Sequence, residues 1–309
     1  MNNQLNSFPI EIGEDVADII RNGGVLKWQQ CQQICQRLSI SVEDLMIQLL
    51  PVAASLSNPV VSNFEVGAVL RGEIKDHNGS ANLYLGANLE FSNQALCYTL
   101  HAEQSAISNA WTEGETRLTD IAISATPCGH CRQFLYEAVG ASEFPILILS
   151  NDETICRIDK TSLKKLLPAA FGPLDLGGEY FFIKPGYQSH QLDVIGIEND
   201  PLVCEALAHA NLSYAPYTNN FSGCSLQISN GKIISGRSIE NAAYNPSISS
   251  MAAALSKAYL SGNNAEDIQR VFLVEQATSV SQKEIAQSML DSYSLGIDVE
   301  YQATNLIKN

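Results

Sequence analysis

The chain has 309 residues, 45% hydrophobic and 17% charged, a balance typical of globular rather than disordered proteins. Its 18 basic and 33 acidic residues give a formal net charge of −15, which repels polyanions and disfavours a nucleic acid as partner. No apolar run is long enough to span a bilayer, and residues 1–13 lack the basic start and apolar stretch of a secretory signal. We therefore expect a cytoplasmic protein without a membrane partner.

The first part of the chain predicts helices. Between residues 14 and 56, apolar residues recur at helical spacing, as Val16 and Ile19 do. Residues 1–46 are therefore assigned to an N-terminal helical segment, in which no residue pattern carries evident chemistry.

Strand-like and helical stretches alternate from residue 60 onward. Strands are predicted at 64–70, 82–86, 121–125 and 144–149. Helices are predicted at 100–111 and after Thr126, which suits an N-cap, and Pro127, which suits a first helical turn. This alternation predicts an α/β domain with helices packed on a sheet, which we place at residues 47–170.

A second domain is expected, because a chain of this length exceeds the usual size of one hydrophobic core. The Gly- and Pro-rich run FGPLDLGG predicts a linker, placed at residues 171–195. Residues 196–309 then form the second domain.

The second domain resembles the first in sequence when the first is shifted by 150 positions. Gly86 then falls on Gly236, and Glu90 on Glu240. The same shift sets four residues without metal chemistry, Met251, Ala253, Thr278 and Ser281, opposite His101, Glu103, Cys128 and Cys131. We therefore expect the second domain to be a degenerate, non-catalytic copy.

One constellation carries metal chemistry, namely H-A-E at 101–103 and P-C-G-H-C at 127–131. The pattern is similar to the H-x-E…P-C-x-x-C signature of zinc deaminases. Two thiolates and one imidazole give Zn²⁺ three ligands and leave the fourth tetrahedral position open, which is typical of a catalytic site. We therefore predict one Zn²⁺ per chain, bound by His101, Cys128 and Cys131.

Glu103 is the predicted proton shuttle of this site. Residues two apart on a regular helix point to opposed sides, so His101 and Glu103 converge only near a helix start. Thr99 suits an N-cap that would place both residues in the opening turn. The alternative is a closed structural zinc site with Glu103 or His130 as fourth ligand, which the presence of only one C-x-x-C motif disfavours.

With these motifs the chain resembles the cytidine deaminases, specifically the long homodimeric bacterial type in which a catalytic domain precedes a degenerate copy. The likeness extends over the runs FEVGA, GANLEF, TLHAEQSAISNAW, TPCGHCRQF, LPAAFGP and GRSIENAAYNP. It implies an α/β fold: a three-layer α/β/α cytidine-deaminase-like domain, duplicated, with an N-terminal helical segment. It also implies a homodimer in which Phe171 and Tyr244 reach across the interface to close the partner's site, although the family often has Phe where Tyr244 stands.

The resemblance further implies roles for residues that contact the substrate. Asn88 and Glu90 would hydrogen-bond the ribose, Phe64 would pack beside the pyrimidine, and Leu89 belongs to the same substrate-binding run. Taken alone, Asn88 is equally well interpreted as a turn residue and Glu90 as a solvated strand end.

These residues predict hydrolytic deamination of free cytidine and 2'-deoxycytidine to the uridine nucleosides, in pyrimidine salvage. Zinc would lower the pKa of bound water, and Glu103 would take the proton, pass it to the pyrimidine N3 and later protonate the departing amine. One alternative is a deaminase of bases within nucleic acid, which the net charge disfavours. Another is a zinc-stabilised scaffold without turnover, which would not require a carboxylate at Glu103.

Overall fold

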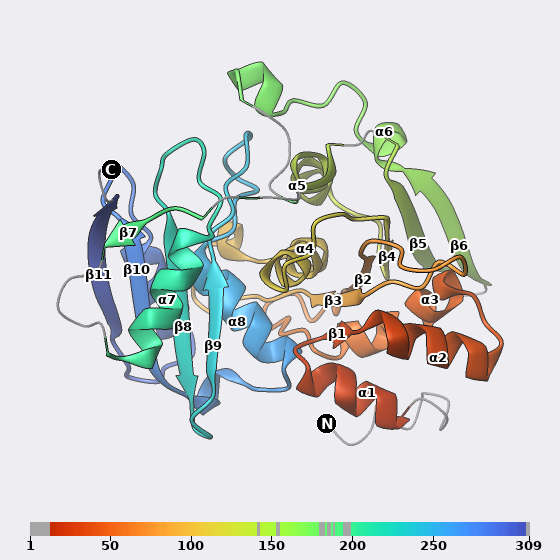
Figure 1. Cartoon of the computed structure of the whole chain (residues 1–309), viewed down its shortest axis with the longest axis horizontal. Coiled ribbons are helices and arrows are strands. Elements are labelled where there is room, and N and C mark those ends of the chain that lie inside the picture. The colour runs from red at the N-terminus through yellow and green to blue at the C-terminus, as the bar shows by residue number, and fades with distance from the viewer. Residues whose placement is uncertain are drawn as a thin grey trace.

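The computed structural model describes residues 13–140, 143–152, 155–178, 183, 187, 189–193 and 199–306. Within this part of the chain, two α/β units lie side by side (Figure 1). In each unit, helices cover both faces of a central sheet. None of the described helices is long and apolar enough to cross a membrane.

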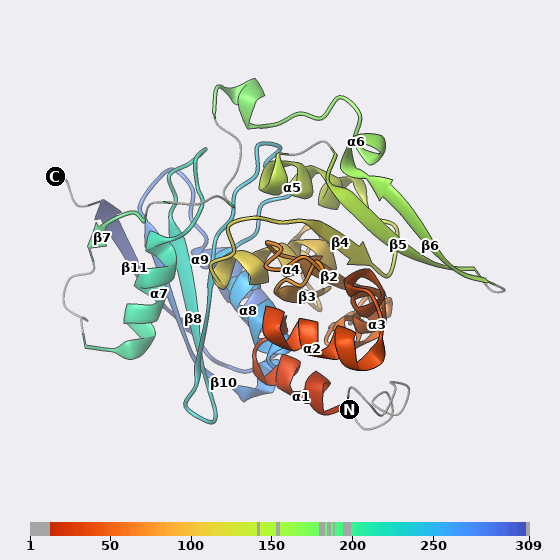
Figure 2. The ribbon, with the colours of Figure 1, turned by 45° about the vertical axis from the view of Figure 1, so that its right-hand side comes forward.

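A six-stranded sheet organises the first unit, in the order β1-β3-β2-β4-β5-β6. β4 and β5 run parallel, and the other neighbouring strands run antiparallel. The β5–β6 hairpin projects from the molecule in Figure 2. The strands are β1 (Val25–Leu26), β2 (Gly67–Arg71), β3 (Leu83–Ala87), β4 (Asp120–Ile123), β5 (Pro145–Asp152) and β6 (Ile155–Ser162).

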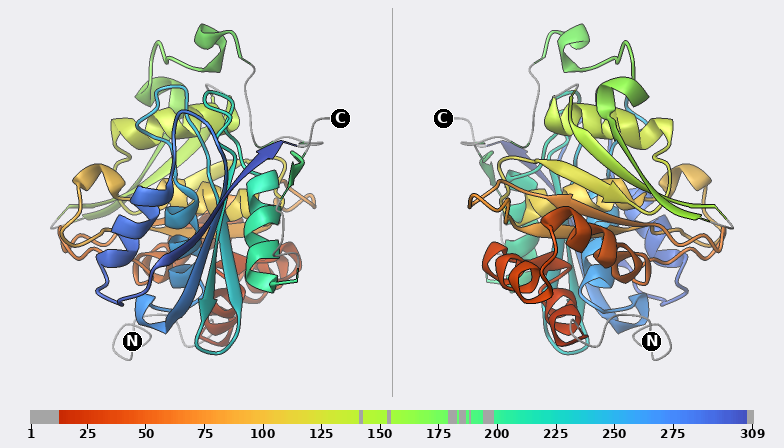
Figure 3. Two further views of the ribbon diagram at one scale, coloured as in Figure 1. Left: turned by 90° about the vertical axis from the view of Figure 1, so that its left-hand side faces the viewer. Right: turned by 90° about the vertical axis from the view of Figure 1, so that its right-hand side faces the viewer.

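Successive side chains of these strands point to opposite faces, and helices cover each face (Figure 3). Val69 and Leu85 pack in a cluster with α1, α2 and α3, whereas Leu70 and Ile121 pack in a cluster with α4 and α5. The helices of this unit are α1 (Gly13–Arg21), α2 (Trp28–Leu38), α3 (Val42–Ala54), α4 (Ala102–Thr112), α5 (Gly129–Val139) and α6 (Leu163–Leu166), with a 3₁₀ turn η3 (Leu96–Tyr98).

The second unit repeats this arrangement around a five-stranded sheet, in the order β7-β11-β10-β8-β9. β10 and β11 run parallel and the other neighbours antiparallel. α7 covers one face, and α8 and α9 pack against the other. The strands are β7 (Leu192–Asp193), β8 (Ser222–Ile228), β9 (Ile233–Arg237), β10 (Ile268–Gln276) and β11 (Val299–Leu306). The helices are α7 (Pro201–Asn211), α8 (Ser250–Leu260) and α9 (Lys283–Asp291), with 3₁₀ turns η4 (Pro173–Leu176) before this unit and η5 (Ala265–Asp267) within it.

This architecture confirms the predicted duplication of a three-layer α/β unit with helices at the N-terminus. The predicted boundary between residues 46 and 47 falls inside α3, which covers the first sheet. The predicted linker at 171–195 contains η4 and β7, and much of the remainder lies outside the described residues, as do residues 1–12 of the N-terminal segment.

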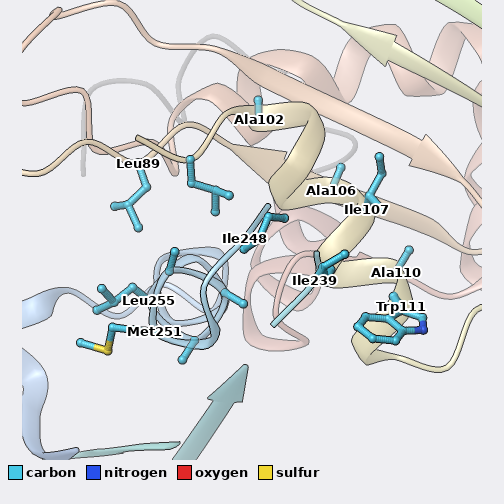
Figure 4. Close-up of a cluster of buried hydrophobic side chains, with 14 of the residues drawn as sticks. Leu89, Ala102, Ala106, Ile107, Ala110, Trp111, Ile239, Ile248, Met251 and Leu255 are labelled. Carbon is cyan, nitrogen blue, oxygen red and sulfur yellow. The ribbon is translucent and has the colours of Figure 1, made fainter. Parts of the chain in front are cut away.

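The two units share a hydrophobic core. Side chains of α4, such as Ile107 and Trp111, lie in one buried cluster with Ile248 and Met251 of the second unit (Figure 4). The hydroxyls of Ser105 and Ser256 hydrogen-bond across the α4–α8 contact at 2.7 Å. The second unit therefore completes the packing of the helix that carries Glu103.

The structure corrects part of the predicted alignment of the two copies. Glu90 and Glu240 are true counterparts, because each accepts hydrogen bonds from two backbone N–H groups and a hydroxyl of its own unit. The helices, however, are offset, because the connection before α8 is shorter and the connection before α9 longer than in the first unit. As N-cap residues, Ser249 corresponds to His101 and Gln282 to Cys128, so the predicted pairings with Met251 and Thr278 were wrong.

Candidate active site

Three potential metal ligands meet where α4 and α5 begin. His101 is the N-cap residue of α4, Cys128 is the N-cap residue of α5, and Cys131 lies in the first turn of α5. The Cys128 sulfur lies 3.5 Å from His101 Nδ1 and 3.5 Å from the Cys131 sulfur, and the three ligand atoms lie within 4.8 Å of one another. In the described part of the chain, this is the one such group of metal-binding side chains. Its imidazole and two thiols are a donor set that suits Zn²⁺.

The helix start explains how His101 and Glu103 converge. α4 begins at Ala102, so His101 has extended backbone angles (φ −88°, ψ 157°) while Glu103 is already helical. Thr99, predicted as the N-cap, instead ends the short 3₁₀ turn η3. Gln104 completes the cap, because its Oε1 accepts a hydrogen bond from the His101 N–H at 3.2 Å.

The two sulfurs have opposite protonation preferences. A hydrogen bond with Cys131, assisted by His101 and by the Cys131 N–H, lowers the pKa of Cys128 to about 3. The hydrogen bond with Cys128, together with burial, raises the pKa of Cys131 well above its ordinary value. The pair therefore holds one proton before a metal binds, and a metal that binds both sulfurs displaces that proton.

Glu103 is a buried carboxylate, 4% exposed, beside this cluster. Burial raises its pKa above the ordinary value, while its own backbone N–H, Cys131 and His101 oppose the shift. A carboxyl group in such a site is suited to accept a proton and return it within one reaction cycle.

A cavity of about 270 Å³ lies over the cluster and is lined by Phe64, Asn88, Glu90, His101, Glu103 and Cys128. Six of the residues predicted for the site thus line one cavity. Ser62 and Thr126 also line the cavity. Sequence reasoning missed Ser62 and predicted Thr126 only as a helix N-cap, a position that Cys128 occupies instead. The position of Thr126 directly before the P-C-x-x-C motif was a usable signal for its place in the site.

Glu90 is fixed at this cavity by the loop between α3 and β2. Its Oε2 accepts hydrogen bonds from the N–H groups of Val61 and Ser62, both at 2.8 Å, and its Oε1 accepts one from the Ser62 hydroxyl at 2.5 Å. Although burial opposes it, these donors lower the pKa of Glu90, so the side chain is a carboxylate near neutral pH. Glu90 is therefore an oriented acceptor rather than a freely solvated strand end.

Asn88 bridges the backbone of the neighbouring loop. Its Oδ1 accepts from the Val66 N–H at 2.8 Å, and its Nδ2 donates to the Phe64 carbonyl at 3.0 Å. Phe64 is 60% exposed at the cavity mouth. Leu89, in contrast, is 2% exposed in the core shared by the two units and does not line the cavity. Leu89 forms isolated β-bridges with Asn58 and Leu100 outside the named strands, and its predicted contact with the substrate stays a prediction.

Phe171 and Tyr244 do not line this cavity within one chain. Phe171 is 45% exposed, and its carbonyl accepts a hydrogen bond from Gln133 Nε2 at 2.7 Å. Tyr244 is 66% exposed and lines a second cavity of about 700 Å³ between the units, whose wall also includes His101 and His130.

His130 lies against the cluster without joining it. Its ring stacks on that of His101, with centroids 5.5 Å apart, and its Nε2 lies 3.4 Å from Gln104 Nε2. Neither His130 nor Glu103 belongs to the group of potential ligand atoms among the described residues. The geometry thus favours three protein ligands over the closed site considered above.

Comparisons with known proteins show the family to which this chain is similar. Models of the family described as "Cytidine and deoxycytidylate deaminase zinc-binding region" match residues 40–147 and 163–287. The chain is 40% identical over 303 residues to the cytidine deaminase of Vibrio atlanticus (strain LGP32), covering 97% of each protein. It is 38% identical over 278 residues to that of Haemophilus influenzae (strain 86-028NP), covering 90% of this chain and 89% of the relative. A solved cytidine deaminase from Burkholderia pseudomallei aligns at 26% identity and a TM-score of 0.35, over 41% of this chain and 98% of the other.

Proposed function

The chain belongs to the zinc-dependent cytidine deaminase family, and we propose that it hydrolyses free cytidine and 2'-deoxycytidine to the corresponding uridine nucleosides and ammonia. One observation carries the proposal: the buried carboxylate of Glu103 shares a cavity of nucleoside scale with the ligand cluster and the oriented carboxylate of Glu90. The consumption of free nucleosides fits a role in pyrimidine salvage.

The residues divide into a metal-binding set and a proton-transfer group. His101, Cys128 and Cys131 would hold Zn²⁺, which supplies a Lewis acid that makes water acidic enough to ionise near neutral pH. Glu103 accepts the proton of the attacking water and delivers it to the pyrimidine N3 as C4 is attacked. Glu103 then carries a proton to the departing amine, so one carboxyl group serves as base and as acid.

Glu90, Asn88 and Phe64, which line the cavity, would orient the substrate. Glu90 accepts a hydrogen bond from a ribose hydroxyl, and the remaining Nδ2 hydrogen of Asn88 donates to the sugar. Phe64 covers the pyrimidine ring. The fixed orientation of Glu90 supports this role, because no ordering cost arises when substrate binds.

We also propose that the active form is a homodimer in which Phe171 and Tyr244 contact the partner's site. Their exposure of 45% and 66%, together with 74% for Leu96, supports a covered apolar surface. Light scattering of the purified protein tests the proposal, and a monomer at assay concentration contradicts it.

The loss of the cytidine absorbance band on adding metal-analysed protein tests the enzymatic proposal. Wild type is expected to deaminate cytidine and 2'-deoxycytidine, whereas Glu103→Ala retains about one zinc per chain and loses on the order of 10²–10⁴-fold in kcat. Near-normal turnover of the variant would contradict the role of Glu103 as proton shuttle. A zinc-loaded wild type that leaves both nucleosides unchanged sinks the substrate assignment.

A further inference from the structure

Glu137 is a fully buried carboxylate on α5, the helix that begins at the two cysteines. Its Oε1 accepts hydrogen bonds from the hydroxyls of Tyr214 at 2.9 Å and Tyr217 at 2.6 Å, and its Oε2 accepts one from the Ala242 N–H at 2.6 Å. All three donors belong to the second unit. Because both carboxyl oxygens of Glu137 accept hydrogen bonds from the second unit, Glu137 links the two units directly.

Ala242 belongs to a short segment, Asn241–Ser247, which we call the tyrosine loop. Glu137 holds the start of this loop through Ala242, and Gln104 holds its end by donating to the Pro246 carbonyl at 2.7 Å. Both anchors come from the helices that carry the zinc motif. The degenerate unit thus places one of its loops directly on the catalytic unit.

Tyr244 lies at the centre of the tyrosine loop in an unfavourable backbone conformation. Its φ of +61° is in the left-handed region, which bulky side chains rarely occupy and which persists where surrounding contacts enforce it. Its ring contacts that of Tyr217 edge to face, with centroids 6.2 Å apart. Glu137 therefore restrains Tyr244 twice, through the loop backbone at Ala242 and through the ring of Tyr217.

We propose that Glu137 is a positioning residue for nucleoside binding, which holds Tyr244 where it closes the active site of the homodimer. The proposal rests on the proposed function. It also assigns a task to the second unit, which lacks the metal ligands of the first: the unit supplies a loop whose conformation is set by the zinc-motif helices.

A pair of isosteric variants tests the anchoring step without substrate. Glu137→Gln replaces one acceptor oxygen by an amide group at nearly constant shape. Glu115→Gln is the matched control, because Glu115 is also buried (7% exposed) and accepts a hydrogen bond from a tyrosine hydroxyl, that of Tyr84, at 3.0 Å. Amide hydrogen exchange of the tyrosine loop is expected to accelerate at least about tenfold in Glu137→Gln and to stay unchanged in the control. Equal exchange in Glu137→Gln and wild type overturns the proposal.

A double-mutant cycle with Tyr244→Ala tests the functional step. Glu137→Gln is expected to raise KM about tenfold, with kcat and zinc content near wild type, and to have no further effect in the Tyr244→Ala background. An undiminished effect in that background overturns the proposal, since Glu137 would then act independently of Tyr244. If Glu137→Gln does not fold, the same double-mutant cycle is measured with Glu137→Asp, which keeps the carboxyl group but shortens the side chain. An inactive wild type overturns the proposed function instead, while hydrogen exchange still decides whether Glu137 holds the loop.

Discussion

The sulfur atoms of Cys128 and Cys131 lie 3.5 Å apart at the start of α5. Their hydrogen bond lowers the pKa of Cys128 and raises the pKa of Cys131. Both are needed as ligands if the site binds zinc through three protein side chains. We predict that Cys131→Ala loses zinc, with less than about one tenth of an ion left per chain by metal analysis. Cys224→Ala, at an equally buried cysteine of the second unit, should keep its zinc. Stoichiometric zinc in the Cys131 variant contradicts the ligand assignment.

Zinc affinity should depend on pH. The pKa of Cys131 is raised by its hydrogen bond with Cys128 and by burial, so this ligand must lose a proton before it binds metal. Protons therefore compete with zinc, and affinity falls as pH falls. We expect the dissociation constant for Zn²⁺, measured against a chelator whose own zinc affinity is known at each pH, to be larger at pH 5 than at pH 8. A dissociation constant that is the same at both pH values argues against the shared proton.

Glu90→Gln should raise KM while zinc remains bound. Gln cannot accept all three donors that hold Glu90, so the variant also loses about 2 kcal/mol of folding stability at pH 7. Burial opposes the shift, but the hydrogen bonds lower the pKa of Glu90 below 4.5, so its stabilisation is complete above pH 4.5 and is lost as pH falls through the lower folded value. Denaturant unfolding from pH 7 to pH 3 should show the two proteins converging; a constant difference contradicts the role of the ionised group.

Two glycines at equivalent places give a matched stability test. A Cβ on Gly86 would lie 2.2 Å from the Ala102 carbonyl in α4, and one on Gly236 would lie 2.2 Å from the Ala254 nitrogen in α8. Each Gly→Ala change should destabilise by about 1–3 kcal/mol because backbone must move. Only Gly86→Ala should also lower zinc content and activity, since α4 begins at the metal cluster. Equal zinc loss in both variants would show that α8 transmits strain to the site.

The sequence predicts the metal cluster because the H-x-E and P-C-x-x-C motifs supply the ligand types, and the structure brings those ligands together. Cys128 and Cys131 three residues apart must share one helical turn, and the pairing of His101 with Glu103 requires a helix start. Leu89 shows the limit of a motif, which names a run of residues but not which of them line the cavity. The alignment of α8 and α9 failed for a related reason, because loop lengths are free to change where no metal fixes the spacing.

Cooperativity of unfolding follows from the core that the two units share. Ile107 and Trp111 on α4 pack in the same buried cluster as Ile248 and Met251, so separation of the units would expose apolar surface of both. Unfolding of either unit would therefore expose buried apolar side chains of the other. Heating should therefore give one calorimetric transition for the whole chain, rather than the two that independently folded repeats would show.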